Sequence, residues 1–364
     1  MGTARVAVIG GGPGGLTCAR MLLSLGHEVV IIDEGSQHLV DLGVCVAPAT
    51  IAFLQRCFSE SFRDGVGFPI STFRSSWGSD VLDARDFSFW AARPGLLIHG
   101  GTFLERMLAV VRSEGGQVMV RSRLRTGSFD GLHWCLTYSN EGVDHSLTVD
   151  FVVEATGRAS RSVLQPDNHR TFIDGLICCT LASPQSSSNI SEARIAASRN
   201  GWWYMVGSEA AGGRISFFTD ADLLSGSGDN PGFLYEEYED VTDLMPSWVA
   251  NSSWSEARKV DARTSFRSLI WRDNWLAIGD AAWTLDPLSG NGVDRAVKDG
   301  SEVATAIDEW VRHGSQNGVR SYARRKGQRF LDALDQRKRY YAMESRWPNS
   351  PFWERRARQL SNGV

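Results

Sequence analysis

The apolar positions at the start of the chain form two short runs separated by a helical stripe. Residues 5–9 and 28–32 are almost entirely apolar, and between them residues 16–25 carry apolar side chains at helical spacing. Short apolar runs of this kind are typical of strands buried on both faces of a parallel sheet. A glycine-rich turn at residues 10–15 joins the first run to the helical stripe. We therefore expect a strand–helix–strand unit with a short first connection.

The pattern further along the chain predicts more elements of both kinds. Helical spacing of apolar residues indicates helices over residues 48–58, 102–112, 293–310 and 321–341. Strand-like runs follow at residues 117–120, 132–138, 146–150, 151–153 and 275–278. The helix at 321–341 is rich in charged residues, so we expect it at the periphery.

The character of the chain changes between residues 171 and 264. Strand-like runs at 173–181, 202–206 and 214–218 alternate there with polar loops. Strands without intervening helical stripes favour an antiparallel sheet, inserted here into a nucleotide-binding domain.

Composition and charge narrow the classes of function. The chain has 364 residues, a formal net charge of −4, and 42% hydrophobic and 22% charged residues, which is ordinary for a soluble globular protein. The negative balance argues against nucleic acid or a membrane surface as a partner. The six cysteines show no metal-binding or redox spacing. We therefore expect a cytoplasmic protein with no metal site.

The turn between the first strand and helix contains the spacing Gly10-x-Gly12-x-x-Gly15. Glycines there permit a tight turn and a close approach to a pyrophosphate, while the helix start offers unpaired N–H groups. Asp33 ends the second strand, at the spacing needed to accept hydrogen bonds from a ribose diol. This combination predicts an adenine dinucleotide site whose candidate contacts are Gly10, Gly12, Pro13, Gly14, Gly15, Asp33 and Glu34.

Two later segments repeat the succession of a buried strand and a polar turn. The first is Glu154-Ala155-Thr156-Gly157-Arg158, for which a plain strand exit is an equal alternative. The second begins with Gly279-Asp280 and continues to a glycine-rich loop before the long helix. N–H groups at that helix start would suit the pyrimidine edge of a reduced flavin, because the helix dipole stabilises negative charge there. The candidate cofactor contacts are Gly279, Asp280, Pro287, Gly290, Asn291 and Gly292.

Together, the three motifs resemble those of the flavoprotein monooxygenase superfamily, which includes para-hydroxybenzoate hydroxylase, the tryptophan halogenases and the geranylgeranyl reductases. The resemblance spans almost the whole chain and implies an α/β fold. That fold consists of a doubly wound, Rossmann-like FAD-binding domain, an inserted antiparallel β-sheet substrate domain and C-terminal helices. It assigns residues 1–70, 95–170 and 265–312 to the FAD domain, 71–94 and 171–264 to the substrate domain, and 313–364 to a C-terminal helical segment.

Within that superfamily the chain resembles the halogenase-like branch. Its Asp286-Pro287-Leu288-Ser289 resembles the Asp-Pro loop of that branch, and Gly201-Trp202-Trp203-Tyr204 partly matches a Gly-Trp-x-Trp motif. The stretch matching the halogenase lysine, residues 71–78, contains Arg74 but no lysine. A guanidinium stays charged and is a poor nucleophile, so halogenation is disfavoured. Three further segments resemble flavoproteins that oxidise a tryptophan within a partner protein during biogenesis of a quinone cofactor: Ser75-Ser76-Trp77-Gly78, Thr219-Asp220-Ala221-Asp222, and Arg346-Trp347 with Phe352-Trp353.

The resemblance implies hydroxylation of an aromatic or indole-like substrate through a C4a-hydroperoxyflavin. The substrate would be an aromatic small molecule or a tryptophan-bearing protein or peptide, with O2 as co-substrate. NADH or NADPH would supply the electrons, directly or through a partner flavin reductase. No catalytic residue is identified. The pocket candidates are His99, Trp203, Tyr204 and Pro287, with a structural role for His99 and a place in the sheet core for the aromatic pair as alternatives.

Three functions remain open at this point. Beside the monooxygenase stands a second enzyme class, a flavin-dependent halogenase or a double-bond reductase. The third is a non-catalytic scaffold with the flavoprotein fold, because the chain has Ile98-His99-Gly100-Gly101 where relatives commonly place an arginine that contacts FAD.

Overall fold

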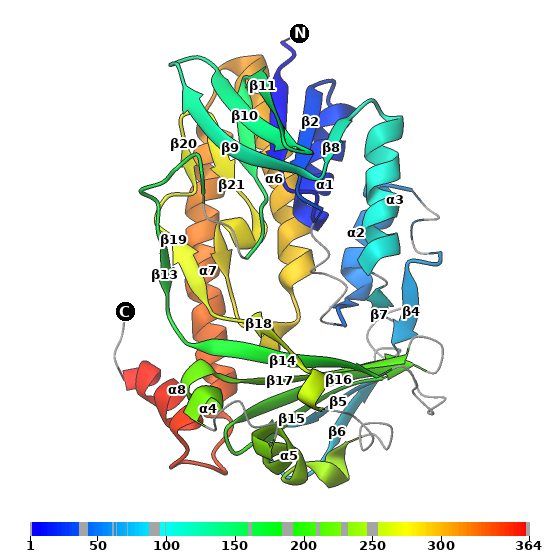
Figure 1. Ribbon diagram of the computed structural model, residues 1–364, viewed down its shortest axis with the longest axis vertical. Helices are drawn as coiled ribbons and strands as arrows, with labels where there is room; N and C mark the ends of the chain where they lie inside the picture. Colours follow the sequence, from blue (N-terminus) through cyan, green and yellow to red (C-terminus); the bar gives the residue numbers. More distant parts are fainter. Residues whose placement is uncertain are drawn as a thin grey trace.

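Strand β1 (Arg5–Ile9) lies inside a six-stranded sheet in the computed structural model (Figure 1). Its parallel neighbours are β12 (Phe151–Glu154) and β2 (Glu28–Asp33). The order is β20-β21-β12-β1-β2-β8, completed by β8 (Gln117–Val120), β21 (Trp275–Ala277) and the antiparallel β20 (Trp271–Arg272). The structure describes residues 2–35, 43–59, 62, 64–70, 72–86, 95–98, 100–158, 162–183, 192–208, 212–226, 232–245 and 254–361.

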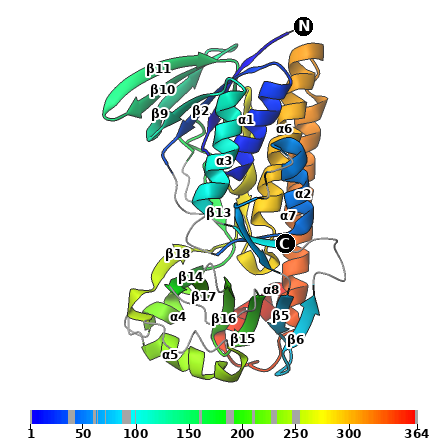
Figure 2. The same ribbon diagram turned by 90° about the vertical axis from the view of Figure 1, so that its right-hand side faces the viewer.

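Both faces of this sheet are covered. Val6 and Val8 of β1 pack towards α1 (Pro13–Ser24), α3 (Gly100–Ser113) and α6 (Gly292–His313). Ala7 and Ile9 point the other way, towards a projecting three-stranded sheet (Figure 2), which consists of β9 (Ser122–Phe129), β10 (Trp134–Asn140) and β11 (Val143–Val149). The alternation follows from the period of two along a strand. The expected doubly wound α/β architecture is confirmed.

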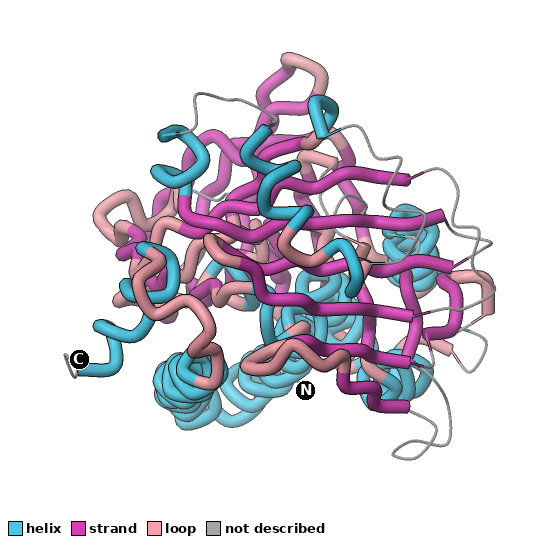
Figure 3. The backbone as a smooth tube through the Cα atoms, turned by 90° about the horizontal axis from the view of Figure 1, so that it is seen from below, coloured by secondary structure: helices cyan, strands magenta, loops and turns pink. Residues whose placement is uncertain are grey.

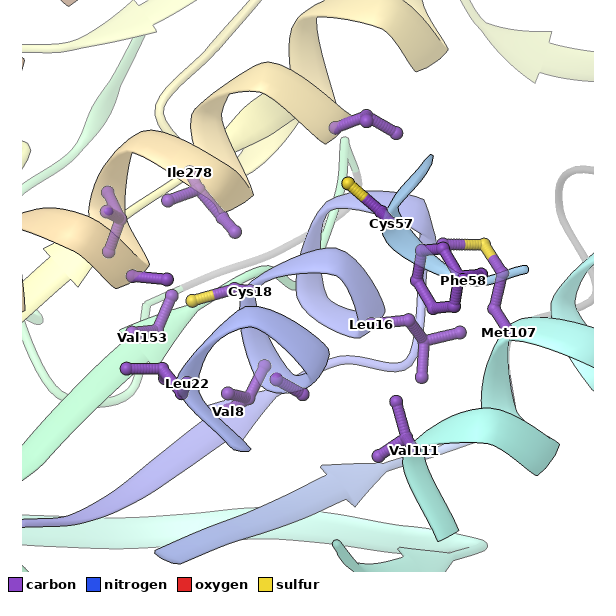
Figure 4. Packing of buried hydrophobic residues seen from close by; sticks show 14 of the residues in the cluster. Val8, Leu16, Cys18, Leu22, Cys57, Phe58, Met107, Val111, Val153 and Ile278 are labelled. Atoms are coloured by element: carbon purple, nitrogen blue, oxygen red, sulfur yellow. The ribbon is translucent and has the colours of Figure 1, made fainter. Parts of the chain in front are cut away.

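A smaller unit extends the helical side of the core. Helix α2 (Pro48–Cys57) buries Ile51, Leu54 and Cys57 in the cluster that contains α1 and α3 (Figure 4). Beside it lies a three-stranded sheet in the order β3-β7-β4, formed by β3 (Cys45–Val46), β7 (Gly95–Ile98) and β4 (Gly67–Ile70). This unit places β3 next to the second large sheet, which is described below.

The second large sheet has seven strands in the order β18-β14-β17-β16-β15-β5-β6 (Figure 3). All its neighbouring pairs are antiparallel except β15 and β5. The strands are β5 (Thr72–Ser76), β6 (Asp83–Asp86), β14 (Leu176–Ser183), β15 (Glu192–Ser198), β16 (Gly201–Ser208), β17 (Gly212–Asp220) and β18 (Arg258–Asp261). This largely antiparallel sheet was expected. The domain limits stay a prediction.

The seven-stranded sheet also has two covered faces. One packs on α5 (Gly232–Glu239) and the short helices η3 (Thr242–Leu244) and η5 (Trp254–Glu256). The other packs on residues of α7 (Asn317–Ala342) and α8 (Pro351–Ser361). Helix α4 (Ala221–Gly226) follows β17 directly. Antiparallel strands β13 (Arg170–Phe172), β19 (Ser265–Arg267) and β22 (Trp283–Thr284) form a third small sheet, with η6 (Gly279–Ala281) and η7 (Pro287–Ser289) nearby in the chain.

Helix α7 lies on the outside of the molecule, as expected, but one of its faces is buried (Figure 2). It buries Tyr322, Lys326, Phe330, Leu334, Arg337 and Tyr341, and it runs from the six-stranded sheet down to the seven-stranded one (Figure 1). Two of these buried residues are charged, and each has an acidic partner on the inner side. Charge along a helix usually marks a solvated face. Here part of it is used in buried ion pairs.

Among the helices within the described ranges, none is both long enough and apolar enough to cross a bilayer.

Candidate flavin-binding site

The glycine turn after β1 leads into a helix whose start is left open. Helix α1 begins at Pro13 with Gly12 as its N-cap, and it has no side-chain cap and no acidic residue in its first turn. A Cβ atom placed on Gly12 would meet no described atom within 4 Å. The first N–H groups of a helix lack intrahelical partners and carry partial positive charge. This turn therefore fits a phosphate.

Asp33 lies beside that turn at the end of β2. Its Oδ1 accepts a hydrogen bond from the Gly11 N–H at 2.8 Å, and its Oδ2 accepts one from Gly35 at 3.2 Å. Glu34 instead points to solvent, where it lies 3.4 Å from Arg123. The structure thus brings Asp33, but not the side chain of Glu34, to the glycine turn.

The second motif packs directly against the first. Gly10 has φ of +112°, and a Cβ atom there would lie 2.5 Å from the carbonyl oxygen of Ala155. Only glycine fits such a backbone contact. Arg158, three residues further on, donates to the carbonyl oxygens of Arg263 and Leu285, both at 2.9 Å. The motif is therefore more than a strand exit, because it joins β1 to Arg263 and to Leu285 within the third motif.

Ala296 of α6 brings the first and third motifs together. A Cβ atom on Gly14 would lie 2.8 Å from the Ala296 carbonyl oxygen. One on Gly279 would lie 3.3 Å from the Ala296 Cβ atom. Gly279 itself has φ of +56°. Gly14 and Gly279, which are far apart in the sequence, thus both lie within contact distance of Ala296.

The starts of α1 and α6 point the same way. Ala296 lies against Gly14, and one turn later a Cβ on Gly300 would lie 3.0 Å from the Cys18 nitrogen. The contacts advance in the same direction along both helices, which lie side by side (Figure 1). Because α6 begins four residues before Ala296, its start reaches about one turn beyond that of α1. Two offset helix starts of this kind suit the two ends of a flavin dinucleotide.

The start of α6 is as open as that of α1. Its N-cap, Asn291, makes no side-chain capping bond. Cβ atoms on Gly290 and Gly292 would meet no described atom within 4 Å. Asp294 in the first turn accepts hydrogen bonds from Thr50 at 2.7 Å and pairs with Lys298 at 2.7 Å. The exposed N–H groups are free to face a ligand.

The Asp-Pro loop before α6 is fixed by contacts with α7. Asp286 caps η7 by accepting from the Leu288 N–H, and it accepts a second hydrogen bond from buried Arg337 of α7 at 2.6 Å. Arg337 also donates to Asp174 at 2.8 Å. Although burial alone would lower it, the pKa of Arg337 lies above its usual value because of the charge of Asp286. Pro287 thus sits on a fixed loop beside the open helix start.

Asp280 points between two cations. Its carboxylate oxygens lie 3.6 Å from Arg158 and 3.6 Å from Arg295. Its carbonyl oxygen accepts from Arg170 at 2.7 Å. Burial lowers the pKa of Arg170 to about 10, and the charge of Arg267 adds to that effect. The side chain is therefore positioned beside the crevice by its neighbours.

Three site residues had no local signal in the sequence: Arg170, Asp299 and Lys326. Arg170 contacts the second and third motifs through carbonyl oxygens of Gly157, Asp280 and Ala281. Asp299 and Lys326 form a buried ion pair beneath Gly279. Each contact joins residues far apart in the chain. A pattern read over a few neighbouring positions does not contain such information.

The two aromatic pocket candidates lie on opposite faces of the seven-stranded sheet. The Tyr204 hydroxyl donates to the Gly43 carbonyl oxygen at 3.2 Å, beside β3. Burial, reinforced by the neighbouring Cys45 thiol, raises the pKa of Tyr204 well above its usual value. Trp203 is fully buried on the other face, where it packs on Trp254 with ring centroids 5.1 Å apart. Trp203 is thus a core residue, which was the alternative considered for it. His99 lies outside the described residues.

A cleft of about 410 Å³ opens between α6 and α7, behind the Asp-Pro loop. Trp283 lines it, with Arg295 and Lys326 each 4.5 Å from the ring. Its lining also includes Asn291 and Arg295, so the cleft reaches the start of α6. In the parts of the chain that the structure describes, no cluster of three or more His, Cys, Asp or Glu side chains is arranged to hold a metal ion.

Comparison with known proteins agrees with this geometry. Residues 3–337 match the family described as FAD binding domain. LodB of Marinomonas mediterranea, which is assigned as an FAD-dependent oxidoreductase, is 24% identical over 96% of this chain and 95% of its own.

Solved structures share the fold. CmlS, a flavin-dependent halogenase, superposes with a TM-score of 0.84 at 22% identity, covering 98% of this chain and 68% of its own. QhpG, a peptidyl tryptophan dihydroxylase essential for tryptophylquinone cofactor biogenesis, gives 0.77 at 21% identity, covering 97% and 78%. At these identities the likeness shows the fold. Given a family match over residues 3–337 and three motifs that meet at one crevice, the chain belongs to the FAD binding domain family and is an FAD-dependent oxidoreductase of the superfamily that contains monooxygenases and halogenases.

Proposed function

We propose that this protein is an FAD-dependent monooxygenase that hydroxylates an electron-rich aromatic ring, with an indole as the preferred class. The observation that carries the proposal is the contact of Gly14 and Gly279 with Ala296, which sets two open helix starts along one crevice. When bound and reduced, the flavin supplies the activation of O2. The protein supplies binding, orientation and the exclusion of water.

Each cofactor contact has a physical role. The open start of α1 binds the pyrophosphate, and the Asp33 carboxylate accepts from the ribose hydroxyls. Asp280 accepts from the ribityl chain, beside Arg158 and Arg295. The N–H groups at the start of α6 face the pyrimidine edge of the ring and stabilise negative charge there. Pro287 bounds the ring on the fixed loop.

Hydroxylation is favoured over halogenation by the segment that corresponds to the halogenase lysine. In β5 the residue available is Arg74, and its guanidinium donates to Glu192 at 2.9 Å. A paired guanidinium offers neither the nucleophilic amine nor the proton exchange that a lysine offers. The likeness to the halogenase CmlS is one of fold, so halogenation is retained as an outcome of the test.

We further propose that the substrate is an indole presented on a protein or peptide. The likeness to QhpG, a peptidyl tryptophan dihydroxylase, supports this class. NADH or NADPH, used directly or through a flavin reductase, would provide the electrons. The sequence has one Gly-x-Gly-x-x-Gly spacing, at Gly10–Gly15, which favours a transient encounter with the electron donor over a separate nucleotide-binding domain.

The deciding experiment first identifies the electron donor that reduces the flavin and then identifies the product formed with oxygen. The FAD-loaded protein is mixed anaerobically with NADH, NADPH, or either nucleotide plus a flavin reductase, and flavin bleaching is followed. Oxygen is then added with indole, phenol or tryptophan-containing peptides, with and without bromide. Incorporation of isotopically labelled oxygen from O2 into an indole product supports the proposal. A brominated product, or turnover of an alkene without oxygen, would replace it with a halogenase or a reductase.

A further inference from the structure

Lys326 of α7 and Asp299 of α6 form a buried ion pair at the wall of the cleft between these two helices. Their side chains are 1% and 3% exposed. The family match and the three glycine motifs assign nothing to either residue. Two buried charges of this kind are rarely the most stable solution, because apolar side chains of similar volume often pack as well. The pair therefore calls for a role other than stability.

Both partners hold the same backbone residue. The Gly279 N–H donates to Asp299 Oδ2 at 2.8 Å, and Lys326 Nζ approaches the Gly279 carbonyl oxygen at 3.5 Å. Gly279 is in the left-handed region, with φ of +56°. The ion pair thus fixes both polar groups of the residue at which the chain turns out of β21.

That turn decides where the next side chain points. Asp280 has its carbonyl oxygen held by Arg170 at 2.7 Å, while its carboxylate lies between Arg158 and Arg295 without a hydrogen bond of normal length from the described groups. Its lone pairs therefore remain available to a ligand hydroxyl. A rotation at Gly279 would move this carboxylate away from the crevice.

We infer that Asp299 and Lys326 are positioning residues for the flavin, acting through Gly279 on the Asp280 carboxylate. The inference rests on the proposed contact between Asp280 and the ribityl chain. The two properties to be separated are the affinity for FAD and the stability of the apoprotein. Replacing both charges by apolar groups restores the packing of the apoprotein, but it leaves the Gly279 amide without an acceptor.

The test compares two double variants of the full-length protein, Lys326→Met with Asp299→Asn and Lys326→Met with Asp299→Leu. Both remove the buried charges, but only asparagine retains an oxygen for the Gly279 N–H. The Kd of FAD is measured by titration of the apoprotein, and the Tm of each apoprotein is recorded. We expect the Kd to rise about tenfold or more in the leucine variant and clearly less in the asparagine variant. The leucine apoprotein should have the lower Tm, because its buried Gly279 N–H has no acceptor, so both Kd values are measured well below either Tm.

Arg325→Met is the matched control. Arg325 is adjacent to Lys326 on α7, and it makes an exposed ion pair with Glu302 of α6 at 3.7 Å without touching Gly279. Its FAD affinity should equal that of the unmodified protein. Equal FAD affinity in both double variants and the unmodified protein would overturn the inference. So would an equal loss in the asparagine and leucine variants.

Asp280→Ala tests the placement of the ribityl chain separately from the positioning role of the ion pair. If it weakens FAD binding while the leucine double variant does not, the positioning role fails and the flavin placement stands. If Asp280→Ala leaves the Kd unchanged, the placement of the ribityl chain at Asp280 is itself wrong.

Discussion

Gly14 of α1 and Ala296 of α6 are in backbone contact, with only 2.8 Å between the Ala296 carbonyl oxygen and the position of a Cβ on Gly14. This contact sets the two helix starts in one crevice. It also distinguishes two glycines of the same turn. Gly14 is needed for the approach of the helices, whereas Gly12 faces open space.

Alanine at Gly14 should therefore lower stability, whereas alanine at Gly12 should lower FAD affinity. Gly14→Ala forces α1 away from α6 and should lower the free energy of unfolding by about 1–3 kcal/mol. Gly12→Ala should keep the stability of the apoprotein within about 1 kcal/mol, but its methyl group would occupy the phosphate space and weaken FAD binding. Denaturant unfolding and FAD titration measure the two effects. A Gly14→Ala protein of unchanged stability would contradict the close approach.

Arg337 should be among the most sensitive residues of α7. Arg337→Met leaves the buried carboxylates of Asp286 and Asp174 without their shared cation. We expect a loss of about 3–5 kcal/mol in the free energy of unfolding. The control is Arg339→Met on the same helix, since Arg339 is exposed and its ion-pair partner among the described residues is Asp335. That variant should change stability by less than about 1 kcal/mol. Equal losses in both variants would show that the loop does not depend on Arg337.

Acid should weaken the attachment of the C-terminal segment through Glu344. This carboxylate accepts from Arg346 and from the Gly78 N–H at 2.8 Å. Burial alone would raise the pKa of Glu344, but these hydrogen bonds hold it below the usual value of 4.5. A pKa that is lower in the folded state stabilises the fold above the unfolded pKa, and this contribution is lost as the pH falls through the folded pKa.

The measurement for Glu344 is the Tm of the apoprotein as a function of pH. The unmodified protein should exceed Glu344→Gln in Tm near neutral pH, and the difference should shrink as the pH falls below about 4.5. A difference that grows in acid would have the wrong sign for this ion pair.

Tyr204 and Trp203 should respond differently because they face opposite sides of β16. Tyr204→Phe removes one hydrogen bond to Gly43 and should cost about 0.5–1.5 kcal/mol of stability, with a change in KM or in FAD affinity. Trp203→Phe should cost about 1–3 kcal/mol through lost packing on Trp254 and leave KM unchanged. Steady-state kinetics and denaturant unfolding of both variants provide the comparison. An altered KM in Trp203→Phe would place that residue near the substrate after all.

The sequence alone was sufficient for the first strand–helix–strand unit, the glycine turn with Asp33, and the presence of a second strand-rich region. These features are local: apolar spacing reports which side of a helix is buried, and a glycine turn of fixed spacing reports a phosphate-sized gap. The motif around Gly279 and the Asp-Pro loop were found in the same way. That Ala296 is the residue at which they meet was decided by the fold alone.

The tertiary structure alone decided which face of β16 holds Tyr204, which side of α7 is buried, and which partners Arg170, Asp299 and Lys326 have. Strand alternation separates two faces but does not say what covers either one. A charged helix likewise looks solvated until a buried carboxylate is found opposite it. Such partners lie far away along the chain, so they are fixed by packing between elements and not by the pattern within any one of them.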